Sequence, residues 1–178
     1  MKTCNLVILA LLLCACQNTD STQTVQQSNP TNVSVHDPKF KNELLTANAR
    51  VLKKEQDEFA VYAREHKMPF IKTPRGVWVY VYVKNTKGMQ VSAGMTINMS
   101  YTLSLLNGDI CETSAGRVVP FQVSAQQAES GLHYGLMLLK KGEKAVFLLP
   151  SSRAQGLMGD QNKIPPQSPL VYTVELET

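Results

Sequence analysis

The sequence predicts an α+β fold in which an antiparallel β-sheet packs around one short helix, preceded by an N-terminal helical extension. The first observation is that apolar and polar residues alternate from Thr96 to Leu105, the period of a half-buried strand. The second is Asn107-Gly108, a dipeptide that strongly favours a hairpin turn. The third is a short apolar segment beginning near Gly131, which is typical of a helix followed at once by a buried strand.

The composition is that of a globular protein with an ordinary surface. Of the 178 residues, 43% are hydrophobic and 18% are charged, which supplies enough apolar material for a core. The formal net charge is +4, and the basic residues form no stripe with interleaved aromatic residues. The charge pattern therefore argues against nucleic acid as a partner.

The first residues predict a targeting segment. Residues 6–13 form an apolar run that is too short for the roughly 20 residues a transmembrane helix needs. Residues 13–16 read Leu-Cys-Ala-Cys and resemble the bacterial lipobox, whose last cysteine accepts a lipid and follows the cleavage site. We therefore expect a signal peptide over 1–15 and a lipid anchor at Cys16, with ordinary secretory cleavage as the alternative.

A disordered tether is predicted over residues 16–36. This stretch is rich in Gln, Asn, Ser and Thr and has too few apolar residues to offset the entropy of ordering. Once the signal peptide is removed and Cys16 carries lipid, Cys111 is left as a free thiol. No intramolecular disulfide is then available, so the core must stabilise the fold.

A helical extension is predicted over residues 37–68. Asp37 followed by Pro38 is a typical helix start. Apolar residues then recur at near-helical spacing at Phe40, Leu44, Ala47, Val51, Phe59 and Tyr62. A polar run over 53–58 interrupts them, so one long helix or two shorter ones fit. The narrow apolar stripe either packs on the following domain or pairs with a second copy in a homodimer.

Strands follow the helical extension. They are predicted over residues 77–83, 97–105, 110–113, 118–123, 145–149 and 170–176. The first alternates valine with aromatic residues, so both of its faces are apolar. Asn107-Gly108 joins the second strand to the third as a hairpin. Pro120 restricts the fourth strand to a sheet edge or a break.

The leucines and glycines after Ser130 define the short helix. Leu132, Leu136 and Leu139 are spaced by four and three residues, which places them on one helical face. Gly142, behind two lysines, is expected to end the helix. Gly131 and Gly135 each cost about 1 kcal/mol relative to alanine in a helix, so we expect close approach of helix to sheet.

The sequence predicts no metal site and no cofactor. Its three histidines have no cysteine or carboxylate at ligand spacing. It also lacks a glycine-rich phosphate loop and a nucleophile elbow. What the pattern does indicate is an apolar hollow into which Tyr101, on the core side of its strand, would point.

A series of short motifs runs through the second half of the chain. The motifs are Tyr101, Asn107-Gly108, Thr113-Ser114, Pro120-Phe121, Gly131-Leu132, Lys141-Gly142-Glu143, Leu149-Pro150, Gly156, Ile164-Pro165-Pro166 and the closing segment from Leu170 to Leu176. In order and in most spacings, the chain from about Pro74 to Thr178 resembles the FKBP-type peptidyl-prolyl isomerases. The resemblance implies a five-stranded antiparallel half-barrel around a short helix, over residues 69–178, with a proline pocket between them.

With the lipobox and the helical preface, the whole chain resembles the lipid-anchored envelope FKBP lipoproteins, among them the gliding-motility-associated type. This resemblance implies a location in the bacterial cell envelope, at the outer membrane. There the protein would assist the folding of proline-containing polypeptides.

The resemblance also implies which residues form the pocket. The catalytic wall would comprise Tyr101, Glu112, Phe121, Leu132, Ile164 and Tyr172. Cys111, Val123, Glu129 and Gln155 would bind the substrate. Leu132 stands where the family usually has a tryptophan floor, and Gln155 replaces a loop tyrosine that commonly donates a hydrogen bond to the peptide carbonyl.

These residues leave the activity open between two classes. Rotation about an X-Pro bond needs no proton transfer, so an apolar pocket that favours the twisted amide would be enough for catalysis. Each apolar residue of the pocket would, however, also be expected in the core of any such barrel. The two substitutions therefore keep a non-catalytic chaperone or protein-interaction lipoprotein as the alternative.

Overall fold

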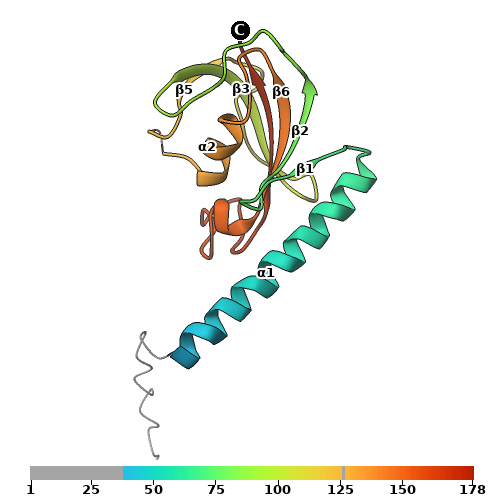
Figure 1. Cartoon of the computed structure of the whole chain (residues 1–178), viewed down its shortest axis with the longest axis vertical. Coiled ribbons are helices and arrows are strands. Elements are labelled where there is room, and N and C mark those ends of the chain that lie inside the picture. Colours follow the sequence, from blue (N-terminus) through green and yellow to red (C-terminus); the bar gives the residue numbers. More distant parts are fainter. Residues whose placement is uncertain (1–37, 126) are drawn as a thin grey trace, which may run out of the picture.

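One antiparallel sheet curves around a short helix, and a long helix lies outside it (Figure 1). The computed structural model describes residues 38–125 and 127–178. Its elements are α1 (Pro38–Glu65), β1 (Ile71–Lys72), β2 (Trp78–Val83), β3 (Thr96–Leu105), β4 (Ile110–Thr113), β5 (Val119–Gln122), α2 (Ser130–Leu136), β6 (Lys144–Leu149), the 3₁₀ turn η1 (Ser151–Arg153) and β7 (Leu170–Leu176). The predicted signal peptide, Cys16, the tether and Asp37 lie outside the described residues.

Within this part of the chain the sheet has seven strands, in the order β1-β2-β6-β7-β3-β4, with β5 also paired to β3. The α+β class and the antiparallel sheet around a short helix are confirmed. The sheet has two strands more than the family pattern of five. One of them, β1, spans only two residues, which is too short for an alternation of apolar and polar residues to predict it.

The hairpin between β3 and β4 follows from its turn residues. Gly108 has a φ of +93°, which strongly favours glycine. The Asn107 side chain accepts a hydrogen bond from the Asp109 backbone N–H at 3.1 Å, which closes the turn. β5 pairs with β3 alone and carries Pro120 opposite Asn98, so its predicted edge position is confirmed.

The two faces of the sheet support two cores. The inner core lies between the sheet and α2, and its fully buried members include Ile97, Met99, Leu136, Leu139, Phe147, Leu149 and Leu170. The outer core lies between the sheet and α1 and consists of Phe59, Trp78, Val146, Leu148 and Val171. Adjacent residues of β2 contribute to both cores, because the Val79 side chain points into the inner core and the Trp78 side chain into the outer core. The prediction of two apolar faces for this strand is confirmed.

Helix α2 lies so close to β6 that a side chain would clash at Gly131 and would be tightly crowded at Gly135. A Cβ at Gly131 would lie 2.7 Å from the Leu149 side chain and 2.9 Å from the Arg153 carbonyl oxygen. A Cβ at Gly135 would lie 3.1 Å from the ring of Phe147. The close approach of helix to sheet is therefore confirmed. It favours glycine at these positions, although glycine has a low helix propensity.

The predicted end of this helix was wrong. Helix α2 ends at Leu136, six residues before Gly142. The side-chain amide of Gln90 donates to the carbonyls of Met137 and Leu139, at 2.8 and 2.9 Å, and takes them out of the helical pattern. Leu139 is still fully buried, but in the segment after the helix.

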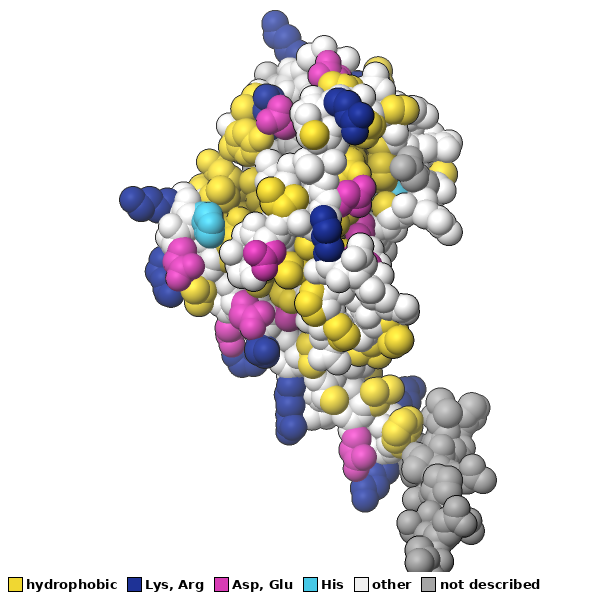
Figure 2. All heavy atoms as spheres, turned by 180° about the vertical axis from the view of Figure 1, so that it is seen from behind, with side chains coloured by type: hydrophobic (Ala, Val, Ile, Leu, Met, Phe, Trp, Pro, Cys, Tyr) yellow, Lys and Arg dark blue, Asp and Glu magenta, His cyan; other side chains and the backbone are white. Residues whose placement is uncertain are grey.

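Helix α1 is one continuous helix of 28 residues. Its second half packs on the outer core, where the Phe59 ring meets the Trp78 ring at 5.7 Å in an edge-on arrangement. Its first half extends beyond the domain in Figure 1, and Leu44 and Leu45 are 51% and 57% exposed. Apolar side chains remain visible among lysines and arginines near that end in Figure 2. None of the helices in the described ranges is both long and apolar enough to cross a membrane.

Two side chains of the polar run dock α1 to the domain. Glu55 is 3% exposed, and its carboxylate accepts hydrogen bonds from the Ser151 hydroxyl and, at 3.2 Å, from the Ser151 N–H. Gln56 donates to the Gly76 carbonyl at 3.0 Å and accepts from the Trp78 indole N–H. The polar run over 53–58 is therefore partly a contact surface between α1 and the domain.

We expect the Glu55 contact to weaken as the pH rises. Burial raises the pKa of this carboxyl above its ordinary value near 4.5, although the hydrogen bonds from Ser151 oppose the shift. Because the folded pKa is the higher one, stabilisation is complete below the unfolded pKa and is lost as the pH rises through the folded pKa. Glu55→Gln keeps an acceptor for Ser151 but cannot ionise. The melting temperature of the variant, compared with the parent from about pH 4 to about pH 7, should lack this decline; parallel profiles would contradict the assignment.

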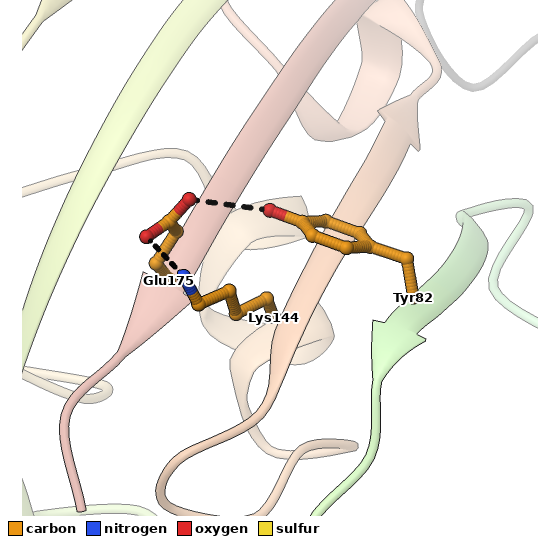
Figure 3. Close-up of polar contacts among 3 residues, drawn as sticks. All are labelled: Tyr82, Lys144 and Glu175. Atoms are coloured by element: carbon orange, nitrogen blue, oxygen red, sulfur yellow. Dashed lines mark hydrogen bonds and ion pairs between the residues drawn. The ribbon is translucent and has the colours of Figure 1, made fainter.

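The outer face of the sheet also carries a polar cluster. It lies at the end of the sheet that is distant from the exposed first half of α1. Lys144 on β6 forms an ion pair with Glu175 on β7 at 2.8 Å, and the Tyr82 hydroxyl on β2 donates to the same carboxylate at 3.4 Å (Figure 3). Lys144 and Glu175 are direct cross-strand partners. The pair therefore favours the observed register of the two strands, in which each inner residue faces α2.

Candidate functional site

A cavity of about 370 Å³ opens between α2, the edge strand β5 and the centre of the sheet. Its lining residues are Met99, Tyr101, Glu112, Val119, Pro120, Phe121, Gln127, Ala128, Glu129, Leu132, Gln155 and Tyr172. Neighbouring strands supply the wall, because β3 pairs with β4, β5 and β7. The loop before α2 and the loop after η1 supply the rim.

The bottom of the cavity is apolar. Met99, Phe121 and Leu132 are between 1% and 5% exposed and come from β3, β5 and α2. Met99 and Tyr101 are two residues apart on β3 and therefore point to the same face of the sheet. Phe121 points the same way from β5 because it pairs with Ile97, and its ring lies 5.2 Å from that of His133.

The first polar element of the cavity is a tyrosine paired with a carboxylate. The Tyr101 hydroxyl on β3 donates a hydrogen bond to Glu112 on β4. Burial, followed by this hydrogen bond and the charge of Glu112, raises the pKa of Tyr101 to about 12. The hydroxyl therefore stays protonated at neutral pH and remains a donor.

A second tyrosine is paired with a buried carboxylate. The Tyr172 hydroxyl on β7 donates to Glu129 at 2.6 Å, and the Gln155 side-chain amide donates to the other oxygen of Glu129 at 2.6 Å. Glu129 is only 7% exposed. Burial, together with the charge of Glu129, raises the pKa of Tyr172 far above its ordinary range. The rings of Tyr101 and Tyr172 lie 6.2 Å apart, so the two pairs share one wall.

A sequence model described as FKBP-type peptidyl-prolyl cis-trans isomerase matches residues 87–177, just over half of the chain. The chain belongs to this family. It is 31% identical over 128 residues to a probable FKBP-type peptidyl-prolyl cis-trans isomerase of Haemophilus influenzae, a match that covers 72% of this chain and 52% of that protein. It is 33% identical over 90 residues to FK506-binding protein 2 of Dictyostelium discoideum, covering 49% of this chain and 68% of that one. The chain thus spans about half the length of the Haemophilus relative.

A solved structure shares the fold. The crystal structure of a peptidyl-prolyl cis-trans isomerase from Pseudomonas syringae pv. tomato aligns with a TM-score of 0.62 at 24% sequence identity. The alignment covers 73% of this chain and 93% of that chain. The FKBP-like fold predicted from the motifs is confirmed.

The FKBP cavity brings together seven of the ten predicted pocket residues. They are Tyr101, Glu112, Phe121, Leu132, Tyr172, Glu129 and Gln155. Cys111, Val123 and Ile164 are buried in the inner core and do not line the cavity. Burial raises the pKa of the Cys111 thiol, so it is a poor nucleophile.

Sequence reasoning missed five lining residues of this FKBP cavity. They are Met99, Val119, Pro120, Gln127 and Ala128. The alternation of β3 places Met99 beside Tyr101 and could have identified it, whereas the loop residues Gln127 and Ala128 carry no such signal. Gln127 adds a second carboxamide to the predicted Glu112, Glu129 and Gln155, so the cavity is more polar than the hollow that the hydrophobic pattern alone indicates.

A larger cleft of about 450 Å³ lies elsewhere, between α1 and the β3–β4 turn. It is lined by Val61, Tyr62, Leu105 and Leu106, among others, and belongs to the surface where α1 docks. The tyrosine–glutamate pairs and the FKBP motifs converge on the smaller cavity, which we therefore take as the functional site. Within residues 38–125 and 127–178, no group of three or more His, Cys, Asp or Glu side chains could hold a metal ion.

Proposed function

We propose that the chain is a peptidyl-prolyl cis-trans isomerase that binds X-Pro segments of polypeptides in the cavity beneath α2. The observation that carries this proposal is a cavity with an apolar floor and protonated tyrosine donors, at the place where the family motifs converge. A volume of about 370 Å³ is within the range of small-ligand sites and accommodates a pyrrolidine ring with its flanking peptide groups.

The mechanism is preferential stabilisation of the twisted amide. Amide resonance sets a barrier of about 18–20 kcal/mol and places negative charge on the carbonyl oxygen of the planar form. Phe121, Leu132 and Met99 exclude water from the imide, which penalises the charge-separated planar form more than the twisted one. Every 1.4 kcal/mol of this difference, approximately, gives a tenfold acceleration.

The polar residues orient the bound segment. Glu112 holds the Tyr101 hydroxyl, and Glu129 holds Tyr172 and Gln155. The side-chain amide of Gln155 uses one N–H on Glu129 and has a second to offer to a peptide carbonyl, as the loop tyrosine commonly does in the family. Cys111, Val123 and Ile164 then act from the inner core, by supporting the wall.

An exchange assay on the full chain tests the proposal. We expect micromolar protein to accelerate cis-to-trans relaxation of a Pro-containing test peptide, which takes roughly tens of seconds or more unaided. Relaxation at the buffer rate, with the protein shown to be folded, would refute the proposed activity.

A second candidate is a chaperone that holds proline-containing or unfolded chains without isomerising them, or an interaction lipoprotein of an envelope assembly. Leu132 in place of tryptophan and the polar lining favour it, because both weaken the grip on a proline ring. If suppression of client aggregation survives the double variant Tyr101→Ala, Phe121→Ala, the holding function is independent of the cavity. Loss of both functions together would favour the isomerase.

We further propose that the protein is an envelope lipoprotein of the gliding-motility-associated type, anchored at the outer membrane through Cys16. In this organisation residues 1–15 are a signal peptide, 16–36 a tether, 37–68 a helical extension and 69–178 the FKBP-like domain. The lipobox motif supports the anchor, and the exposed leucines of the first half of α1 support homodimerisation. Incorporation of labelled palmitate that is lost in Cys16→Ser, and the mass of the solubilised protein, test the two points.

A further inference from the structure

The cavity is acidic. Glu112 and Glu129 line it, and its lining residues include no lysine, arginine or histidine in the part of the chain that the structure describes. The chain as a whole carries a formal net charge of +4. The negative charge of the cavity is therefore a local feature, opposite in sign to the net charge of the chain.

Both carboxylates are held by neutral donors. Glu112 accepts from Tyr101, and Glu129 accepts from Tyr172 and Gln155. The ion pairs of the described residues are Lys53–Asp57, Lys54–Glu58 and Lys144–Glu175, so neither cavity carboxylate has a cationic partner within 4 Å. Hydrogen bonds from neutral groups fix the position of a carboxylate but leave its charge uncompensated.

The two charges act on the same space. Burial is the largest cause of the raised pKa of both Tyr101 and Tyr172, but the charge of Glu129 also contributes to the shift of Tyr101 and the charge of Glu112 to that of Tyr172. Each carboxylate therefore acts on the other tyrosine–glutamate pair, and the two tyrosine rings lie 6.2 Å apart. Glu129 is buried, where solvent screens its charge poorly, whereas Glu112 is exposed and can be contacted. A concave site lined by one sign of charge focuses its field on what enters.

We propose that the cavity selects X-Pro segments that carry lysine or arginine next to the proline and disfavours those with aspartate or glutamate there. Glu112 is the specificity-determining residue that contacts the cationic side chain, and the buried Glu129 adds to the negative field. The inference rests on the proposed binding of X-Pro segments in this cavity. It names the class of segment that the site takes.

The experiment compares matched peptides on the full chain. Tetrapeptides of the form Ala-X-Pro-Phe and Ala-Pro-X-Phe, with X as Lys, Gln or Glu, are assayed for exchange rate and, by competition, for binding. At low salt we expect kcat/KM for the better lysine peptide to exceed that for its glutamate counterpart by about three- to tenfold, from one attraction gained and one repulsion avoided. The ratio should fall as salt is raised to about 0.5 M, because the Debye length shrinks.

Glu112→Gln should bring the lysine-to-glutamate ratio at least halfway to one. Glu65→Gln, which removes the same charge from α1 beside the other cleft, should leave the ratio as in the parent. The ratio within one variant is the readout because it cancels any general loss of folding or turnover.

Equal kcat/KM for all peptides would overturn the inference and leave the isomerase proposal standing. No exchange of any peptide, together with tighter binding of the lysine peptides, would refute the isomerase and support the inference. No binding of any peptide would overturn both. A ratio that is unchanged in Glu112→Gln would also overturn the role assigned to that residue.

Discussion

Phe59→Ala should cost about 3–5 kcal/mol of unfolding free energy, because it empties a fully buried ring site. Phe59 is the part of α1 that enters the outer core, and its ring packs edge-on against Trp78. Without it, the second half of α1 loses its main apolar contact and the indole becomes exposed. Trp78 is the one tryptophan of the chain, so tryptophan fluorescence reports on this part of the outer core.

Urea unfolding followed by fluorescence measures the effect of Phe59→Ala, and a red-shifted emission of the folded variant would show the indole in water. The matched control is Leu44→Ala on the exposed first half of the same helix, which should stay within about 0.5 kcal/mol of the parent. A loss below about 1 kcal/mol for Phe59→Ala, with unchanged emission, would mean that α1 is not docked as described.

Phe121→Ala should lower kcat/KM for prolyl exchange at least tenfold, equivalent to about 1.4 kcal/mol of transition-state stabilisation. Phe121 is 5% exposed and forms the β5 side of the cavity floor. Removing its ring admits water to the imide, and the desolvation that favours the twisted amide is then lost. Exchange is followed with a Pro-containing peptide, with folding checked by circular dichroism.

Phe70→Ala is the control for Phe121→Ala. Phe70 packs on the outer core, on the opposite side of the sheet, so the same truncation destabilises the domain without opening the cavity. It should keep the parental kcat/KM at a temperature where both variants are folded. Equal activity of the two variants would show that the floor of the cavity does not contribute to catalysis.

Local pattern was enough to predict much of the fold. The alternation around β3 and the turn residues Asn107 and Gly108 act within a few positions, so the hairpin could be read from adjacent residues. The end of α2 could not, because it depends on Gln90, a side chain 47 and 49 residues away from the carbonyls that it binds. The burial of Glu55 could not be predicted for the same reason, because its partner Ser151 is 96 residues away.

The candidate site also has some features that could be predicted from the sequence and others that depend on residues far apart in the chain. Tyr101, Phe121 and Leu132 could be named because each lies in a short motif through which the chain resembles the FKBP family. The Glu129 contacts could not be predicted, since Tyr172 and Gln155 reach it from two other segments, 43 and 26 residues along the chain. Glu112 and Glu129 were both predicted as pocket residues from the resemblance, but hydrophobic periodicity does not show that their charges act without a cationic partner.

The tight seating of α2 on β6 determines where this cavity can adapt. A helix whose glycines already lie against Leu149 and Phe147 has little room to move closer to the sheet. One side of the cavity is therefore a fixed template. We therefore expect the two rim loops, before α2 and after η1, to adjust to different bound peptides. Redesign of these loops is the most direct way to alter the selectivity of the cavity.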